Sequence, residues 1–439
     1  MTFISFNPAT GQQNGVFETL SASRLEGCLQ QSGEAAERWR QSSFAERAAL
    51  LNRLAALLSA NRERLALCVT REMGKLLSES LAEVDCCARE CAYFAAHGQA
   101  MLPLARSLTT FEPLGTVLLL GSWRFPLWQL FRMLAPTLMA GNAVLLKLAE
   151  NLPLCAREIE ALVREAEVPE GLVASLAVDK ARVAELIRDP RVQALGFSGN
   201  RADGARLSAL AAQQLKPVAL ELDQAEWQLV LDDADLELAV EAALHLRFSN
   251  AGQHGVGAGS FMVTPAIADD FVALLATRLA ACQPGHPEDL DSRLAPLATR
   301  PLREELHRQL TAAVDEGARL VAGGVLPESD GWYYPASLLD GVTPAMALFR
   351  GLPSGPLAAV VRVRDAEQMG SLCRGLGAHG GARIWTRDLV LGEQLARRLP
   401  FGRCLVNQAP GRAYPPGAAV DGHFNIKAFC RMKSLLISV

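Results

Sequence analysis

Hydrophobic side chains follow a helical period in the N-terminal part of the chain. Between residues 21 and 98 they recur three and four positions apart, with Arg and Glu between them, as in "SFAERAALLNRLAALLSANRERLALCVTREMGK". This spacing places the apolar side chains along one face of a helix. We therefore expect a series of amphipathic helices here.

After residue 112 the pattern changes to short apolar runs that alternate with helical segments. Continuous runs such as Val117–Leu120 and Ala143–Lys147 are typical of strands buried on both faces of a parallel sheet. Helical periodicity occupies 127–140 and 153–166, and another strand is expected at 192–199. Such alternation predicts βαβ units in a doubly wound sheet.

A second α/β lobe is expected from about residue 225, where "WQLVLDDADLELAVEAALHLRF" gives a strand and then a long helix. The 439 residues suffice for roughly two or three domains. The chain is 50% hydrophobic and 21% charged, with a net charge of −4, so nothing indicates a nucleic-acid or membrane partner. Because the N-terminus lacks the features of a signal peptide, we expect a cytoplasmic protein with reduced thiols.

The ten cysteines are scattered, and only Cys86, Cys87 and Cys91 lie close together. Adjacent residues and a five-residue offset on a helix do not suit a zinc site, whose four ligands form a tetrahedron. We interpret these cysteines as small buried apolar residues. No metal is expected.

Two segments are candidates for ligand binding. In "GFSGNRADG", which follows a strand and opens a helix, Gly199 would let backbone amides approach a phosphate. The segment is not GxGxxG, so a glycine that serves only the turn is an alternative. Lys147, followed closely by Glu150, ends a strand at the edge where open α/β sheets bind ligands. The alternative is a solvated lysine.

Two titratable residues are candidates for catalysis. Glu221, at the end of the apolar run "PVALEL", suits a general base with a raised pKa. A salt-bridged glutamate at a strand end is an equal alternative. His254 in "FSNAGQHGVGAGS" is the loop's titratable side chain and suits a base or nucleophile. The alternative is a surface or hydrogen-bonded histidine.

The order of the motifs resembles the aldehyde dehydrogenase superfamily, and most closely its succinate-semialdehyde-dehydrogenase-like branch. The resemblance covers nearly the whole chain, in "NPATG", "EPLG", "FPLWQLFRMLAPTLMAGNAVLLK", "FSNAGQ", "GPLAAVVRV" and "IWTRD". It implies an α/β protein with three parts. These are a Rossmann-type NAD(P) domain (1–94 and 114–224), an α/β catalytic domain (225–408) and a small β oligomerisation arm (95–113 and 409–439).

The resemblance also implies which residues would carry the reaction. In that family a Cys thiolate attacks the aldehyde, an Asn side chain and a backbone amide hold the oxyanion, and a Glu activates water. The nucleophile position falls at Gly255 and the oxyanion Asn at Arg124. The Glu that binds the nicotinamide ribose falls at Leu352, whereas the general base survives as Glu221.

Further substitutions surround the same reaction centre. Asp223 and Gln224 stand where the family has two glycines beside the nicotinamide, and Ser354 stands where it has Phe. The C-terminal motif, "PPGAAVDG", also differs from the pattern of that family. The resemblance still assigns cofactor contacts to Trp123, Lys147, Glu150, Gly199, Asn200 and Leu222.

These substitutions predict a dehydrogenase-inactive pseudoenzyme with a structural, binding or regulatory role. We expect NAD or NADP binding to be weak or absent. A homodimer, a higher homo-oligomer or a hetero-oligomer with an active paralogue is expected. The alternative is an enzyme with residual NAD(P)-dependent semialdehyde oxidation, or with a non-oxidative activity that uses Glu221, His254 and Arg124.

Overall fold

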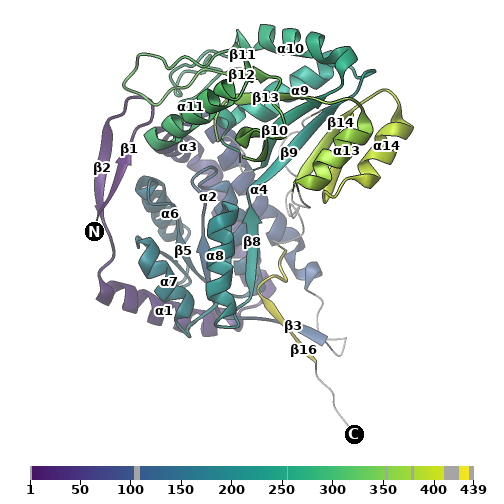
Figure 1. Cartoon of the computed structure of the whole chain (residues 1–439). Coiled ribbons are helices and arrows are strands. Elements are labelled where there is room, and N and C mark those ends of the chain that lie inside the picture. Colours follow the sequence, from purple (N-terminus) through teal and green to yellow (C-terminus); the bar gives the residue numbers. More distant parts are fainter. Residues whose placement is uncertain are drawn as a thin grey trace.

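Two mainly parallel sheets with helices packed against them form the body of the protein (Figure 1). The computed structural model describes residues 2–102, 109–254, 256–351, 354–376, 380–409 and 425–434. The α/β class predicted from the sequence is confirmed.

The helices predicted in the N-terminal part are present. They are α1 (Ala22–Arg40), α2 (Phe44–Ala60), α3 (Arg62–Met73) and α4 (Leu77–Met101). Ser21 and Ser43 cap the first two by accepting hydrogen bonds from backbone N–H groups of the first turn. The hairpin that precedes them, β1 (Thr2–Phe6) and β2 (Gln13–Glu18), was not predicted from the sequence.

The first sheet has five parallel strands in the order β6-β5-β4-β7-β8. The strands are β4 (Thr116–Leu120), β5 (Ala143–Lys147), β6 (Val173–Ser175), β7 (Val192–Gly199) and β8 (Val218–Leu222). The connecting helices are α5 (Trp128–Ala140), α6 (Pro153–Glu165), α7 (Lys180–Arg188) and α8 (Arg201–Ala212). The predicted doubly wound arrangement is confirmed for this sheet.

Each central strand of this sheet contributes to two cores, because successive side chains of a strand point to opposite faces. Leu119 and Leu146 join the core that contains α5, whereas Leu118 and Leu145 join the core on the other face, with α7 and α8. Burial on both faces explains why these strands are continuous apolar runs.

The second sheet has seven strands in the order β11-β12-β13-β10-β9-β14-β15, and only the β11–β12 pair is antiparallel. Its strands are β9 (Gln224–Val230), β10 (Val256–Val263), β11 (Arg319–Ala322), β12 (Ser337–Asp340), β13 (Leu357–Arg362), β14 (Gly381–Trp385) and β15 (Arg403–Val406). Its helices are α9 (Leu236–Phe248), α10 (Pro265–Leu279), α11 (Arg300–Asp315), α12 (Ala347–Arg350), α13 (Ala366–Gly375) and α14 (Leu389–Arg398).

A single residue joins the two sheets. Strand β8 ends at Leu222 and β9 begins at Gln224, so Asp223 alone lies between them. The side chain of Asp223 is therefore placed at the junction of the two sheets. The predicted domain boundary at 224 falls at this junction, and the domain limits themselves stay predictions.

A small two-stranded sheet projects from the body (Figure 1). Strand β3 (Thr109–Pro113) pairs antiparallel with β16 (Cys430–Ser434). Glu112 accepts hydrogen bonds from Arg40, Arg431 and Lys433 at 2.9, 3.2 and 2.7 Å. These strands lie within the predicted oligomerisation arm, of which residues 103–108, 410–424 and 435–439 are outside the described residues.

Two further expectations concern cysteines and membranes. All ten cysteines are free; Cys87 and Cys91 are fully buried, as expected for small apolar residues, whereas Cys86 is only partly buried. None of the helices in the described part of the chain has the length and apolar character needed to cross a bilayer.

Candidate functional site

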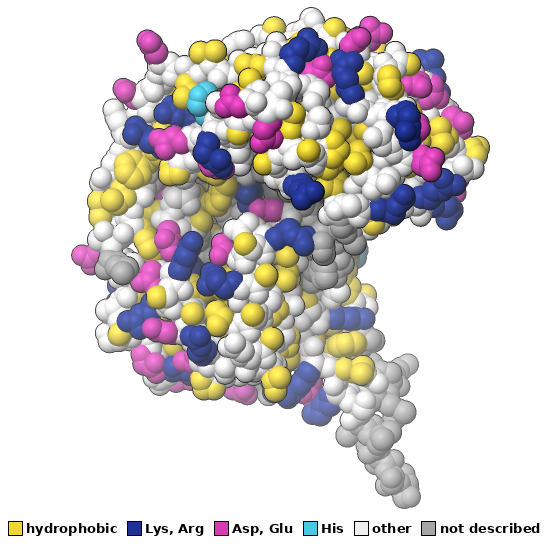
Figure 2. Space-filling model, viewed as in Figure 1, with side chains coloured by type: hydrophobic (Ala, Val, Ile, Leu, Met, Phe, Trp, Pro, Cys, Tyr) yellow, Lys and Arg dark blue, Asp and Glu magenta, His cyan; other side chains and the backbone are white. Residues whose placement is uncertain are grey.

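A cavity of about 430 Å³ lies at the carboxyl edge of the five-stranded sheet. The segments that follow β4, β5 and β7 line it, together with α7, the start of α8 and Thr299. The surface view shows a hollow between the upper and lower parts of the molecule (Figure 2). This edge is where open α/β sheets bind ligands.

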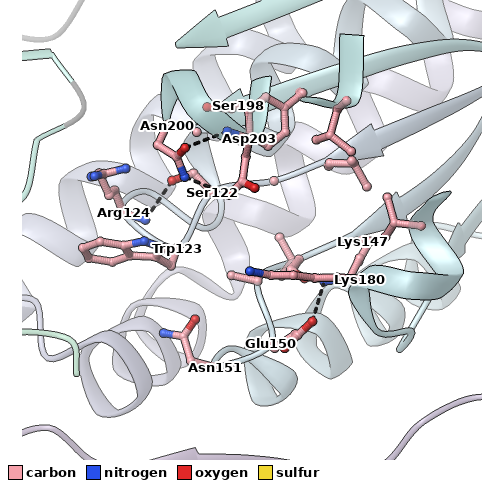
Figure 3. Close-up of a pocket in the computed structure, with 18 of the residues that line it drawn as sticks. Ser122, Trp123, Arg124, Lys147, Glu150, Asn151, Lys180, Ser198, Asn200 and Asp203 are labelled. Atoms are coloured by element: carbon pink, nitrogen blue, oxygen red, sulfur yellow. Dashed lines mark hydrogen bonds and ion pairs between the residues drawn. The ribbon is translucent and has the colours of Figure 1, made fainter. Parts of the chain in front are cut away.

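Most of the sequence-predicted cofactor residues meet in this cavity (Figure 3). The residues that line it as predicted are Trp123, Lys147, Glu150, Gly199 and Asn200. Leu222 does not line it, and its side chain lies against Gly204 of α8. Two cations that the sequence analysis did not single out, Lys180 and Arg206, lie in the wall.

Lys147 is the last residue of β5 and is only 9% exposed. The interpretation as a solvated lysine is therefore wrong. Its Nζ atom donates to the carbonyl oxygen of Leu148 at 3.1 Å and lies 3.9 Å from the carboxylate of Glu150. Burial lowers the pKa of Lys147 from its usual value, and the nearby Glu150 opposes this effect.

The turn between β7 and α8 ends in a helix cap. Asn200 accepts a hydrogen bond from the backbone N–H of Asp203 and donates one to its carboxylate, both at 2.8 Å. A Cβ atom at Gly199 would come within 2.6 Å of the Phe197 ring, so the turn has no room for a side chain. The hydroxyl of Ser198, which also lines the cavity, is buried without a hydrogen-bond partner.

Three residues at substituted positions bind one another at the end of this cavity. Arg124 donates to the Oδ1 atom of Asp223 at 3.0 Å, lies 2.8 Å from its Oδ2 atom in an ion pair, and donates to the hydroxyl of Ser354 at 3.4 Å. Its guanidinium group also lies over the Trp123 ring, 4.8 Å from the centroid. The side chains of Arg124 and Asp223 are only 11% and 16% exposed.

The pair between Arg124 and Asp223 is therefore difficult to open. Burial raises the pKa of Asp223, and the adjacent Arg124 opposes that rise. Removing one partner of a buried pair leaves the other charge uncompensated and costs roughly 3–5 kcal/mol. Any molecule that enters the space between the two side chains has to overcome a penalty of this kind.

Glu221, the predicted general base, is in a buried ion pair with Arg132 of α5. The side chains are 7% and 5% exposed, and the guanidinium group of Arg132 lies 4.9 Å from the Trp128 ring centroid. Burial raises the pKa of Glu221 although Arg132 opposes the rise. The salt-bridge interpretation is confirmed, whereas the base role stays a prediction.

Arg132 is a site residue that the sequence analysis missed. Its signal in the sequence was a charged residue within the otherwise apolar helix "WQLFRMLAPTLMA". A buried arginine needs a partner, but the helix pattern alone does not identify Glu221 as that partner.

His254 is partly buried and hydrogen-bonded, as the alternative interpretation expected. Its Nε2 atom lies 2.8 Å from the hydroxyl of Ser249, and its ring packs 5.0 Å from the Phe125 ring. The Nζ atom of Lys75 lies over the same Phe125 ring, 3.8 Å from its centroid. Burial, with a smaller contribution from Lys75, lowers the pKa of His254 to about 3, so the imidazole is neutral at pH 7.

The backbone before His254 is strained and held by several groups. Asn250 and Ala251 both have φ of +50°, a left-handed conformation that costs on the order of 1–3 kcal/mol per residue. The backbone N–H of Asn250 donates to Glu79 at 2.6 Å, and its side chain donates to the carbonyl oxygen of Arg124 at 3.1 Å. These contacts tie the loop to the segment that carries Arg124. Gly255 and Leu352 lie outside the described residues.

The low pKa of His254 predicts a loss of stability in acid. The unfolded chain takes up a proton near the usual pKa of 6.5, whereas the folded chain does not until about 3, so stability falls as pH decreases. Between pH 7 and pH 5 the expected loss from this residue is about 1–2 kcal/mol. Urea unfolding at both pH values should show a smaller pH dependence for His254→Gln than for the wild type. Equal pH dependence in the two proteins would contradict the assignment.

Three groups that suit metal binding lie together elsewhere in the described part of the chain: Cys68, Glu72 and Cys155. The Glu72 carboxylate already accepts the backbone N–H groups of Leu154 and Cys155, at 2.8 and 2.7 Å, and so caps α6. The neighbouring Cys68 and burial raise the pKa of the Cys155 thiol, which disfavours the thiolate that a metal requires. We therefore interpret the cluster as a helix cap.

Comparison with known proteins identifies relatives over the whole chain. The model of the aldehyde dehydrogenase family matches residues 1–422. The chain is 36% identical to the NAD(P)+ succinate semialdehyde dehydrogenase of Escherichia coli (strain K12), covering 98% of this chain and 97% of the relative. It is 34% identical to the NADP+ succinate-semialdehyde dehydrogenase of Deinococcus radiodurans, over 95% of this chain and 88% of that one.

Solved structures show the same fold. The succinic semialdehyde dehydrogenase of Streptococcus pyogenes, crystallised with NADP+ as the cofactor, superposes with a TM-score of 0.92 at 26% identity and 99% coverage of both chains. The succinate-semialdehyde dehydrogenase of Burkholderia pseudomallei has a TM-score of 0.91 at 28% identity, over 100% of this chain and 95% of the other. The architecture is thus that of these dehydrogenases.

Proposed function

Because the chain belongs to the aldehyde dehydrogenase family, we propose that it is a member without dehydrogenase activity, with a binding, structural or regulatory role. The observation that carries this proposal is the identity of the residues around the reaction centre. Gly255 stands at the nucleophile position, and glycine has no group that can attack a carbonyl carbon. Without a covalent intermediate, the family's reaction lacks its first step.

The environment of Arg124 supports the same proposal. An oxyanion donor has to be free to point at the substrate oxygen as charge develops on it. At this position the guanidinium group of Arg124 is engaged with Asp223 and Ser354. We infer that the substituted side chains stabilise one another in place of a substrate.

The environment of Glu221 adds further support. A general base in the resting enzyme has to be accessible to the water that it deprotonates. The carboxylate of Glu221 is buried and faces Arg132. Arg132 favours the ionised form and binds one carboxylate oxygen, Oε1, an arrangement that suits a structural ion pair.

The alternative of another activity based on Glu221, His254 and Arg124 has less support. Each of the three has its own partner, respectively Arg132, Ser249 and Asp223. The pKa of His254, about 3, makes its imidazole a weak base at pH 7. We therefore do not favour a new catalytic triad of these residues.

We also propose that the protein self-associates, or joins an active paralogue, through the small sheet of β3 and β16. The support is that this sheet projects from the body and exposes Met432, which is 68% accessible. We also propose a cytoplasmic location, because the enzymes of this family are soluble and because free cysteines are typical of a reducing compartment.

The test of the proposed function is a turnover assay with succinate semialdehyde and either NAD+ or NADP+. The protein should be produced in a host strain that lacks its own dehydrogenases for this substrate. A rate of NADH or NADPH formation above that of a mock preparation would contradict the proposal.

A further inference from the structure

The cavity beside the five-stranded sheet ends at Arg124. Arg124 and Trp123 line it, whereas among the described residues Glu221, Asp223 and Ser354 do not. Arg124 thus joins the wall of the cavity to Asp223 and Ser354, which lie outside it. The resemblance places the nicotinamide of a dinucleotide beside position 223. The nicotinamide end thus does not fit the residues present.

The cavity that does exist has the chemistry of a phosphate site. Four cations line it (Arg124, Lys147, Lys180 and Arg206), against two carboxylates (Glu150 and Asp203). Among the described residues that line it, three buried polar atoms have no hydrogen-bond partner: the Ser198 hydroxyl, the Asn151 Nδ2 atom and the Arg124 Nε atom. All three are donors that a bound ligand would satisfy, because buried polar groups normally have partners.

The other end of the cavity has the chemistry of a nucleoside site. The Glu150 side chain is 41% exposed beside Lys147, so its carboxylate is available to accept hydroxyl groups of a sugar (Figure 3). Apolar side chains supply a surface for a flat base; they are Leu148, Val183, Phe197 and Leu207. Cations, a sugar-facing carboxylate and an apolar wall are thus present together.

We propose that this cavity binds a nucleoside diphosphate rather than a whole nicotinamide dinucleotide. The inference rests on the proposed function, since an active dehydrogenase needs the nicotinamide in the space that Arg124 and Asp223 occupy. The phosphates lie against the cations, and the base and sugar lie between α7 and Glu150. The nicotinamide half of a dinucleotide adds no contact and stays outside.

Calorimetric titration with ADP, NAD+, NADP+ and inorganic pyrophosphate tests this proposal on the whole protein. ADP is expected to bind, and neither dinucleotide is expected to bind more tightly than ADP. A dinucleotide that binds more than about tenfold tighter than ADP overturns the proposal. The proposal is also overturned if pyrophosphate binds as tightly as ADP, because the cavity would then be an anion site without a nucleoside site. No heat with ADP at about 1 mM overturns it as well.

Two variants on helix α7 locate the ligand. Lys180→Met removes a cation from the cavity wall, whereas Arg182→Met removes one two residues away that does not line the cavity. Both change the net charge equally, so they differ only in local contact. Lys180→Met should weaken ADP binding by about tenfold and Arg182→Met by less than about twofold. Equal weakening in both variants would show long-range attraction without a site, which contradicts the proposal.

A double variant tests whether the buried pair closes the nicotinamide end. Arg124→Asn with Asp223→Gly removes both charges together, so neither is left uncompensated. It should raise the affinity of NADP+ above that of ADP, because the obstacle to the nicotinamide half is removed. Unchanged dinucleotide affinity, with the fold verified by circular dichroism, overturns the assignment of the pair as the obstacle.

The outcomes separate this inference from the proposed function. Turnover of semialdehyde by the wild type would contradict the proposed function, whatever the order of nucleotide affinities. Absence of ADP binding in a protein without turnover would contradict only the ligand inference. The assay and the titration use the same preparation, so the two results are directly comparable.

Discussion

The wild-type protein is expected to oxidise succinate semialdehyde at least about 10⁶-fold more slowly than an active relative assayed with its preferred dinucleotide. Loss of a covalent nucleophile alone typically lowers the rate by about this factor, because the residues of such a site act as a unit. Gly255 supplies no nucleophile. The E. coli relative, which is 36% identical, serves as the positive control.

Returning the thiol alone should not return the activity. In Gly255→Cys the guanidinium group of Arg124 is still bound to Asp223, and the side-chain amide that the family uses for the oxyanion is absent. Loss of such a donor costs about 10²–10³ in rate. The triple variant Gly255→Cys, Arg124→Asn, Asp223→Gly should therefore exceed Gly255→Cys by at least about 10². Equal rates in the two variants would show that the buried pair does not limit the chemistry.

Arg132→Met is expected to lower the free energy of unfolding by about 3–5 kcal/mol at pH 7. The substitution leaves the buried carboxylate of Glu221 without the cation that faces it. Urea unfolding followed by circular dichroism measures the loss. The surface pair of Arg278 with Glu237, with side chains 44% and 62% exposed, supplies the matched control. Arg278→Met should cost less than about 1 kcal/mol.

The double variant Arg132→Met, Glu221→Gln distinguishes charge from packing. It removes the uncompensated carboxylate, so most of the stability lost in Arg132→Met should return. If the double variant is as unstable as the single one, the loss comes from packing and the ion pair is not the cause.

The pH dependence of Arg132→Met provides a sign test. Burial already raises the folded-state pKa of Glu221, and removal of Arg132 removes the group that opposes the rise. A carboxylate with a raised folded pKa favours the folded state at low pH, and that contribution is lost as pH rises. The difference in the free energy of unfolding between Arg132→Met and the wild type should therefore become smaller as the pH is lowered from 7 to 5. A deficit that grows in acid would contradict the account.

Much of the fold was predictable because its signals are local. Strands β5 and β7 coincide with the predicted 143–147 and 192–199, since strands buried on both faces read as continuous apolar runs. The hairpin of β1 and β2 was not predicted. Its first strand, "TFISF", has mixed burial and is short, so its pairing with residues 13–18 has no strong local signal.

The sequence by itself predicted which positions at the reaction centre are substituted, because their identities differ from the motif order that the chain resembles. Only the tertiary structure decided what those side chains do. Arg124 is 99 residues from Asp223 and 230 from Ser354, and Arg132 is 89 from Glu221. Hydrophobic periodicity encodes the local backbone, whereas a buried charge takes its partner from whatever the folded chain brings within a few ångströms. Hence the ion pairs that Arg124 and Arg132 form become visible only in three dimensions.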